Sequence, residues 1–159
     1  MIKIMFVCHG NICRSTMAEF VFKHMVKKLK IENDFFISSS GTSSEELGNG
    51  VHYGTKEKLK SLNIFVDNNK RATKLKSSDF ANNDYLIAMD SYNVKNIHKI
   101  CQTNPFDNND KIFKLLDLTT NKRDIADPWY TGNFDETYDD IYNGCVTLLN
   151  YLGYDIEKL

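Results

Sequence analysis

The apolar residues near the N-terminus change their spacing once, from a strand-like run to a helix-like repeat. Positions 2–7 read Ile-Lys-Ile-Met-Phe-Val, a short apolar run typical of a buried strand. After a polar stretch, apolar residues recur at three- and four-residue steps, at Ala18, Val21, Phe22, Met25 and Leu29. Lysines fill most of the opposite face, namely Lys23, Lys27, Lys28 and Lys30. The pattern predicts a strand, a loop and an amphipathic helix with a solvated lysine face.

Further strand-like and helix-like segments alternate along the rest of the chain. Apolar runs predict strands at 35–39, 85–89 and 111–116. Helical spacing predicts helices at 51–63 and 91–100, and a last amphipathic helix over 138–152. Within the first helix, Thr16-Met17-Ala18-Glu19 matches a capping box and predicts that the helix starts there. A long loop before the last helix carries Asp127.

This alternation predicts one α/β domain over residues 1–159. We expect a doubly wound three-layer sandwich, in which right-handed crossovers join four parallel strands and helices cover both faces of the sheet. Ligands bind such sheets beyond the carboxyl ends of the strands. The loop after the first strand begins at Cys8, and the loops holding Ser39, Asp90 and Asp127 also follow strands. These four loops are therefore candidates for one site.

Composition narrows the class of protein. The chain has 159 residues and a formal net charge of −1, which argues against a nucleic-acid or anionic-membrane surface. It has no run of eighteen apolar residues and no cleavable apolar leader, so we expect a cytoplasmic protein, and we expect a monomer.

The four cysteines are expected to be reduced. Metal-ligand spacing is missing among His9, His24, His52 and His98, so neither a metal nor another cofactor is predicted.

The strongest chemical signal is the segment from Cys8 to Ser15, Cys-His-Gly-Asn-Ile-Cys-Arg-Ser. Five residues between Cys8 and Arg14 are enough to curl a loop whose backbone N–H groups point inward around an anion. Arg14 adds two parallel donors that suit phosphate oxygens. The helix that follows stabilises both a bound dianion and a thiolate through its N-terminal partial charge. A Cys-x5-Arg spacing alone often occurs by chance. Gly10, Ser15 and the flanking strand and helix make a chance match much rarer.

These residues predict phosphoryl transfer through sulfur. Attack by Cys8 on a phosphate ester would give a cysteinyl-phosphate, whose oxygens Arg14 and the loop amides would hold without a metal. The leaving group needs a proton from a carboxylic acid. Positions after strands leave four candidates for that acid, namely Asp90, Asp117, Asp124 and Asp127.

The motif from Val7 to Ser15, together with Asp127-Pro128-Trp129-Tyr130, resembles the low-molecular-weight protein tyrosine phosphatases. Weaker similarity covers 39–42, 84–90 and the last helix. The resemblance implies that the chain hydrolyses phosphotyrosine in proteins, releases inorganic phosphate and uses Asp127 as the general acid. It also implies that Trp129 and Tyr130 wall the cleft beside the aromatic leaving group. With Cys8 ionised and Asp127 protonated, the rate should peak below neutral pH.

The resemblance also implies supporting roles. His9, Gly10, Asn11, Ile12, Cys13 and Ser15 would contact the substrate phosphate or shape its loop. Ser15 would donate a hydrogen bond to the Cys8 thiolate, and Asn11 would brace the loop with Ser39 and Asn93. Ordinary turn and helix-cap roles for Ser39 and Asn93 remain open as alternatives. Asp90 would be a buried acceptor, and Cys13 would form a reversible disulfide with Cys8. The chain departs from the family pattern at Thr16, at Thr131 and at 52–54, where an Asp-x-Arg is missing.

Three other functions remain open on sequence alone. An arsenate reductase on this fold would need two further cysteines after the third strand, where the chain has Cys101. A phosphoarginine phosphatase typically carries threonine in place of Ile12. A phosphotyrosine-binding module without turnover would keep Arg14 but need neither Cys8 nor Asp127.

Overall fold

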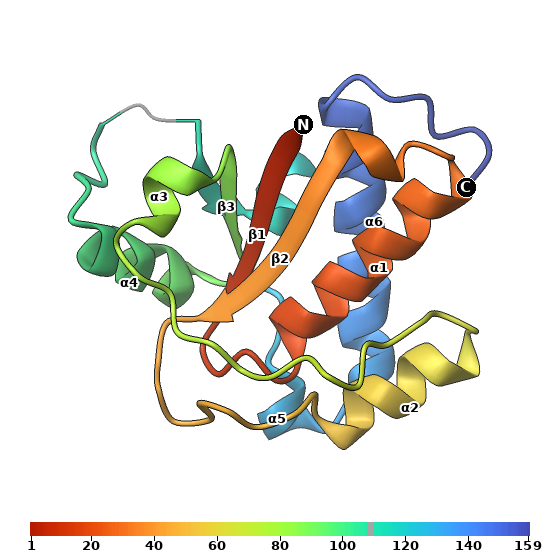
Figure 1. Cartoon of the computed structure of the whole chain (residues 1–159), viewed down its shortest axis with the longest axis horizontal. Coiled ribbons are helices and arrows are strands. Elements are labelled where there is room, and N and C mark those ends of the chain that lie inside the picture. The colour runs from red at the N-terminus through yellow and green to blue at the C-terminus, as the bar shows by residue number, and fades with distance from the viewer. Residues whose placement is uncertain (108–109) are drawn as a thin grey trace.

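A parallel sheet lies between two layers of helices in the computed structural model, which describes residues 1–107 and 110–159 (Figure 1). The strands are β1 (Ile2–Cys8), β2 (Phe35–Gly41), β3 (Tyr85–Ala88) and β4 (Ile112–Lys114). The α-helices are α1 (Arg14–Lys28), α2 (Tyr53–Ser61), α3 (Asp79–Asn82), α4 (Ser91–Cys101), α5 (Pro128–Thr131) and α6 (Phe134–Tyr151). Short 3-10 helices lie at η1 (Glu32–Asp34) and η2 (Leu115–Leu118).

The four strands are ordered β2-β1-β3-β4, and every pairing is parallel. Helices α1 and α6 cover one face of the sheet, and α3 and α4 lie on the other side (Figure 1). The predicted doubly wound α/β fold is confirmed. Strand order reverses between β1 and β3, so the loop after β1 opens where such folds bind ligands.

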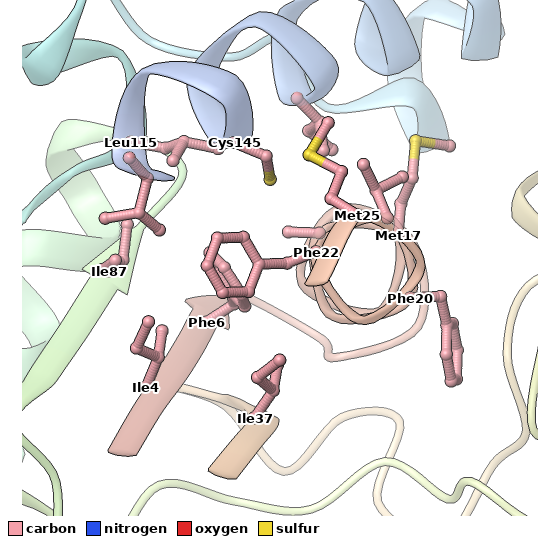
Figure 2. Close-up of a cluster of buried hydrophobic side chains, with 14 of the residues drawn as sticks. Ile4, Phe6, Met17, Phe20, Phe22, Met25, Ile37, Ile87, Leu115 and Cys145 are labelled. Carbon is pink, nitrogen blue, oxygen red and sulfur yellow. The ribbon is translucent and has the colours of Figure 1, made fainter. Parts of the chain in front are cut away.

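Side chains of β1 alternate between two hydrophobic clusters, because successive residues of a strand point to opposite faces. Ile4, Phe6 and Cys8 belong to the cluster under α1 and α6, and Val7 belongs to the cluster under α4. Figure 2 shows the first cluster, where Phe6 meets Phe22 edge to face with ring centroids 5.8 Å apart. This packing fixes the direction of β1 and delivers Cys8 to the sheet's edge.

Three sequence-based boundaries are wrong, and one of them is the start of the last helix, which lies at Phe134 rather than at 138. Helix α1 begins at Arg14 rather than at a Thr16 cap, because the loop runs directly into the first turn. Thr16 Oγ1 instead donates to the carbonyls of Ile12 and Cys13, each at 3.0 Å. The strand predicted at 111–116 stops at Lys114 and continues as η2.

Two short helices, α3 and α5, lie where the apolar pattern predicts none. Each is four residues long, too short for helical periodicity to emerge. Within residues 1–107 and 110–159, no helix has the length and apolar character needed to cross a bilayer.

Candidate active site

The loop between β1 and α1 folds around the sulfur of Cys8. Cys8 ends β1 and is 3% exposed. The backbone N–H of Asn11 donates to its Sγ at 3.3 Å, and Ser15 Oγ lies 3.0 Å from the same sulfur. Since Ser15 Oγ already accepts a hydrogen bond from Asn11 Nδ2 at 2.8 Å, its own hydrogen is free to point at sulfur. Two donors therefore face Cys8, and both favour the thiolate.

Asn11 holds the loop in shape. Its φ of 57° lies in the left-handed region, which asparagine tolerates better than most residues. Its Nδ2 also donates to Ser39 Oγ at 3.0 Å, while its Oδ1 accepts from the backbone N–H of Thr73 at 3.0 Å. The predicted Asn11–Ser39 contact is therefore present, and it ties the loop to the end of β2.

Of the two roles left open for Asn93, loop brace and helix cap, the structure shows the helix cap. Asn93 forms a capping box with Asp90 at the start of α4. Its Oδ1 accepts from the backbone N–H of Asp90 at 3.1 Å, and its own N–H donates to Asp90 Oδ1 at 2.8 Å. Asn93 thus orients Asp90, which in turn holds Arg14.

Arg14 is buried beside the sulfur, at 3% exposure, and one of its nitrogens is fully occupied. Nη1 donates to Asp90 Oδ2 at 2.7 Å and to the carbonyl of Ile125 at 2.9 Å. Nη2 donates to Asp127 Oδ2 at 3.4 Å. Burial lowers the pKa of Arg14, but the charges of Cys8 and Asp127 and the bond to Asp90 outweigh it and raise that pKa. Arg14 is therefore a fixed cation. Asp90 is the expected acceptor, but its side chain is 17% exposed, so it is part-buried rather than buried.

The late Asp127 segment closes the site from the other side. Asp127 caps α5, accepting at Oδ1 from the backbone N–H of Trp129 at 3.1 Å, and Pro128 opens that short helix. Trp129 is 56% exposed and Tyr130 is 83% exposed, so both rings are available at the rim. Pro128 fixes the backbone beside Asp127, which limits where this carboxyl can move.

These segments line a small pocket of about 60 Å³. It is lined by most of the residues predicted from sequence, namely Cys8, His9, Gly10, Ile12, Cys13, Arg14, Asp127, Trp129 and Tyr130. Asn11 and Ser15 lie behind the loop and act on Cys8 and on each other. Within residues 1–107 and 110–159, no three His, Cys, Asp or Glu side chains gather in a metal-binding arrangement.

The pocket also has acidic walls that sequence reasoning missed. Glu45 and Glu46 line it from the loop after β2, and Glu45 Oε2 lies 3.0 Å from His9 Nε2. Their position after the end of a strand was an available signal. The histidine His52 was missed as well: its ring stacks on Phe134 with centroids 5.3 Å apart and meets Trp129 edge to face at 5.6 Å.

Cys13 lies in the same pocket as Cys8 but differs from it chemically. Burial, followed by the negative charges of Asp127 and Cys8, raises the pKa of Cys13 to about 12. Cys13 is therefore a neutral thiol near pH 7. The site thus combines one nucleophilic sulfur with hydrogen-bond donors, one buried guanidinium and one carboxyl group across the pocket, a set suited to transfer of a tetrahedral oxyanion.

Comparison with known proteins agrees with this chemistry. The family model described as low molecular weight phosphotyrosine protein phosphatase matches residues 3–158. The chain therefore belongs to that family. It is 38% identical over 151 residues to the low molecular weight protein-tyrosine-phosphatase YfkJ of Bacillus subtilis, covering 94% of each chain. It is 38% identical over 156 residues to PtpA of Staphylococcus aureus, covering 98% of this chain and 96% of PtpA.

Solved structures give the same result. The crystal structure of Bacillus subtilis YfkJ superposes with a TM-score of 0.89 at 37% identity, covering 96% of this chain and 94% of YfkJ. The Streptococcus pyogenes low molecular weight protein tyrosine phosphatase superposes with a TM-score of 0.85 at 40% identity, covering 98% and 95% of the two chains. The fold around the pocket is thus the family's fold.

Proposed function

We propose that this protein hydrolyses phosphotyrosine and other aryl phosphate monoesters through a cysteinyl-phosphate intermediate, without a metal. One observation carries the proposal: Cys8 Sγ lies in a pocket with the N–H of Asn11 at 3.3 Å, while Asp90 and Ile125 hold Arg14 beside it. The names of the relatives support the same substrate class.

In the first step, the Cys8 thiolate attacks phosphorus and the bond to the phenolic oxygen breaks. The leaving oxygen takes its proton from the Asp127 carboxylic acid, and phosphate is then bound to sulfur. Arg14 Nη2 and the backbone amides of residues 9–14 stabilise the negative oxygens. In the second step, the Asp127 carboxylate takes a proton from water as the water attacks phosphorus. Inorganic phosphate leaves and the Cys8 thiolate returns.

The remaining pocket residues have positioning and contact roles in this proposal. Gly10, Ile12 and Cys13 contribute loop amides to the phosphate, and Asn11 and Ser15 hold the thiolate and the loop shape. His9, Trp129 and Tyr130 contact the rest of the substrate at the rim. A phosphotyrosine-containing cytoplasmic protein is the proposed substrate of a monomeric enzyme. The Cys8–Cys13 disulfide remains a prediction, supported by the presence of both thiols in one pocket.

The arsenate reductase alternative has less support. That reaction needs a relay of cysteines near the nucleophile, whereas Cys101 is buried with Val7 and Leu86 in the cluster on the other face of the sheet. A resident Asp127 beside exposed aromatic rings suits an aryl leaving group better than arsenate.

Hydrolysis of p-nitrophenyl phosphate in the presence of a chelator tests the proposal. We expect turnover by the wild type, at least a thousandfold loss in Cys8→Ser, on the order of the losses known for essential nucleophiles, and about a hundredfold or greater loss in Asp127→Ala. Asp117→Ala is the matched control, because Asp117 was an equal candidate for the acid on sequence alone and does not line the pocket. Phosphotyrosine binding without turnover in the wild type would contradict the proposal.

A further inference from the structure

A lysine-rich surface lies at the end of α1 that is farther from the candidate active site. At its centre is Phe65, an aromatic side chain that is 78% exposed. Ile64 before it is buried at 6% exposure, and Val66 after it packs against the core. Because Ile64 and Val66 both pack toward the core, the backbone between them holds Phe65 facing outward. The exposure of Phe65 is therefore a fixed feature of the fold.

Hollows of about 460 Å³ and 590 Å³ flank Phe65, which lines both of them. Lys23, Lys27 and Lys28 line the first hollow, beside Phe20. Figure 2 shows that Phe20 leaves α1 on the side away from Phe22. Lys56 and Lys60 line the second hollow. We call Phe65 and these five lysines the Phe65 surface.

Cations outnumber carboxylates on this surface, although the whole chain has a net charge of −1. Glu57 and Asp67 are the carboxylates among the described residues that line the two hollows. Lys23 is paired with Glu19 at 2.6 Å. His24, which also lines the first hollow, has its pKa lowered by burial and then by the charges of Lys28 and Lys27. The local potential is therefore positive around an exposed aromatic ring.

The surface is separate from the candidate active site. Arg14 opens α1 at the pocket, and Lys27 lies thirteen residues further along the helix, a distance of about 20 Å at the usual rise per residue. None of the six residues of the Phe65 surface lines that pocket.

We propose that the Phe65 surface binds an acidic protein segment that carries an apolar side chain between its carboxylates. The ring of Phe65 contacts the apolar side chain, and the lysines on both sides pair with the flanking carboxylates. The two concave hollows favour a peptide chain, whose side chains fit into hollows, over a flat bilayer or a convex duplex. Charge complementarity then sets the association rate and the register of the segment.

Fluorescence anisotropy with the full chain tests this docking surface. The probe is a short fluorescein-labelled peptide of glutamates around one leucine, and a lysine-for-glutamate version of the peptide is the charge control. We expect the protein to bind the acidic peptide but not its lysine version. The affinity for the acidic peptide should fall as the salt concentration is raised. We expect about tenfold weaker binding in Phe65→Ser and in Lys27→Gln/Lys28→Gln, the loss typical of hot-spot residues.

Matched variants on α4 separate this surface from general electrostatics. Tyr92→Ser removes another exposed aromatic ring, at 76% exposure, and Lys95→Gln/Lys99→Gln removes two exposed lysines. We expect these variants to bind the peptide as the wild type does. Absence of peptide binding, equal losses in the α4 variants, or tighter binding to phosphatidylglycerol vesicles or duplex DNA would overturn the proposal. Hydrolysis of p-nitrophenyl phosphate should be unchanged in every variant. The outcome of the peptide-binding test is therefore independent of the proposed phosphatase activity.

Discussion

At the residue scale, the two thiols of the pocket have opposite environments. Cys8 faces the N–H of Asn11 and the hydroxyl of Ser15, and both contacts favour a negative sulfur. Cys13 has lost water through burial and lies near the negative charges of Asp127 and Cys8. One loop thus contains a sulfur that faces two hydrogen-bond donors and a sulfur kept protonated by burial and nearby negative charge.

This difference predicts selective alkylation. With a pKa of about 12, Cys13 is ionised in only about one molecule in 10⁵ at pH 7, and the thiolate is the form that reacts. Iodoacetamide at pH 7 should therefore modify Cys8 and leave Cys13 intact, and inorganic phosphate should protect Cys8. As pH rises toward 12, Cys13 should begin to react.

Tandem mass spectrometry is needed to measure the two sites, because Cys8 and Cys13 lie on the same tryptic peptide. Cys13→Ser is the control and should be modified at the same rate as the wild type at pH 7. Preferential labelling of Cys13 at neutral pH would contradict the described environment.

The residue scale also shows what a motif can and cannot specify. The order of Cys8, Arg14 and Ser15 predicts the loop and its anion site, because the short spacing leaves the chain little freedom. The partner of Asn93 could not be predicted in this way, because an asparagine after Asp90 fits both a distant loop and its own helix cap. The local alternative won, since Asn93 completes a capping box without any long-range contact.

At the element scale, the Asp127 segment is held by four residues from other segments, namely Met89, Arg14, Lys114 and Ser91. Ile125 donates its N–H to the Met89 carbonyl at 2.9 Å and accepts from Arg14. Asp124 Oδ1 accepts from Lys114 Nζ and from Ser91 Oγ, each at 3.0 Å. These bonds fasten the segment to β4 and to the start of α4 just before the candidate acid.

We therefore expect Asp124→Asn to lower kcat by a few-fold while KM changes little, because a misplaced Asp127 affects proton transfer more than phosphate binding. Asp139→Asn on α6, which also removes an exposed carboxylate, should behave as the wild type. Steady-state kinetics with p-nitrophenyl phosphate measure both values. An unchanged kcat in Asp124→Asn would show that the other bonds suffice to hold the segment.

The same carboxylate predicts a change of stability with pH. Burial raises the pKa of Asp124, but the hydrogen bonds from Lys114 and Ser91 outweigh it, so the pKa lies below the ordinary value of 3.8. The contribution of Asp124 to the free energy of unfolding is therefore present above pH 3.8. It is lost as pH falls through the lower pKa that Asp124 has in the folded state. Asp124 is about half exposed, so urea unfolding of Asp124→Asn should show a deficit of at most about 1 kcal/mol at pH 7. That deficit should vanish in acid.

Sequence periodicity predicted the long elements better than the short ones. The strands and helices around β1, α1, β3, α4 and α6 have enough apolar positions to show their period. Helix α5 has only Pro128 buried, so its position depends on the Asp127 cap rather than on a hydrophobic face. The Thr16 capping box was wrong for a related reason, because the loop amides continue into α1 and leave Thr16 within the helix.

At the scale of the whole molecule, a nearly neutral chain separates its charges. The Phe65 surface is rich in lysine, whereas Glu45, Glu46 and Asp127 line the pocket around one buried guanidinium. The overall net charge of −1 does not reveal this separation, which depends on the loop after β2 folding toward the loop after β1. Composition argues against nucleic-acid and membrane partners, but it could not place the acidic residues Glu45 and Glu46 at the pocket.

Glu45 and Glu46 at the pocket predict a preference for the residues that flank the phosphotyrosine of a substrate. Carboxylates at the mouth of the pocket should favour lysine beside the phosphotyrosine and disfavour glutamate, even though His9 Nε2 lies 3.0 Å from Glu45 Oε2. In Glu45→Gln/Glu46→Gln, the ratio of kcat/KM for a lysine-flanked peptide over a glutamate-flanked peptide should fall about three- to tenfold, as expected for two exposed charge pairs. Added salt should shrink the wild-type ratio toward that of the variant, because exposed charges are screened. The control Glu32→Gln/Glu157→Gln removes two exposed carboxylates elsewhere, and a similar fall in that variant would assign the preference to net charge rather than to Glu45 and Glu46.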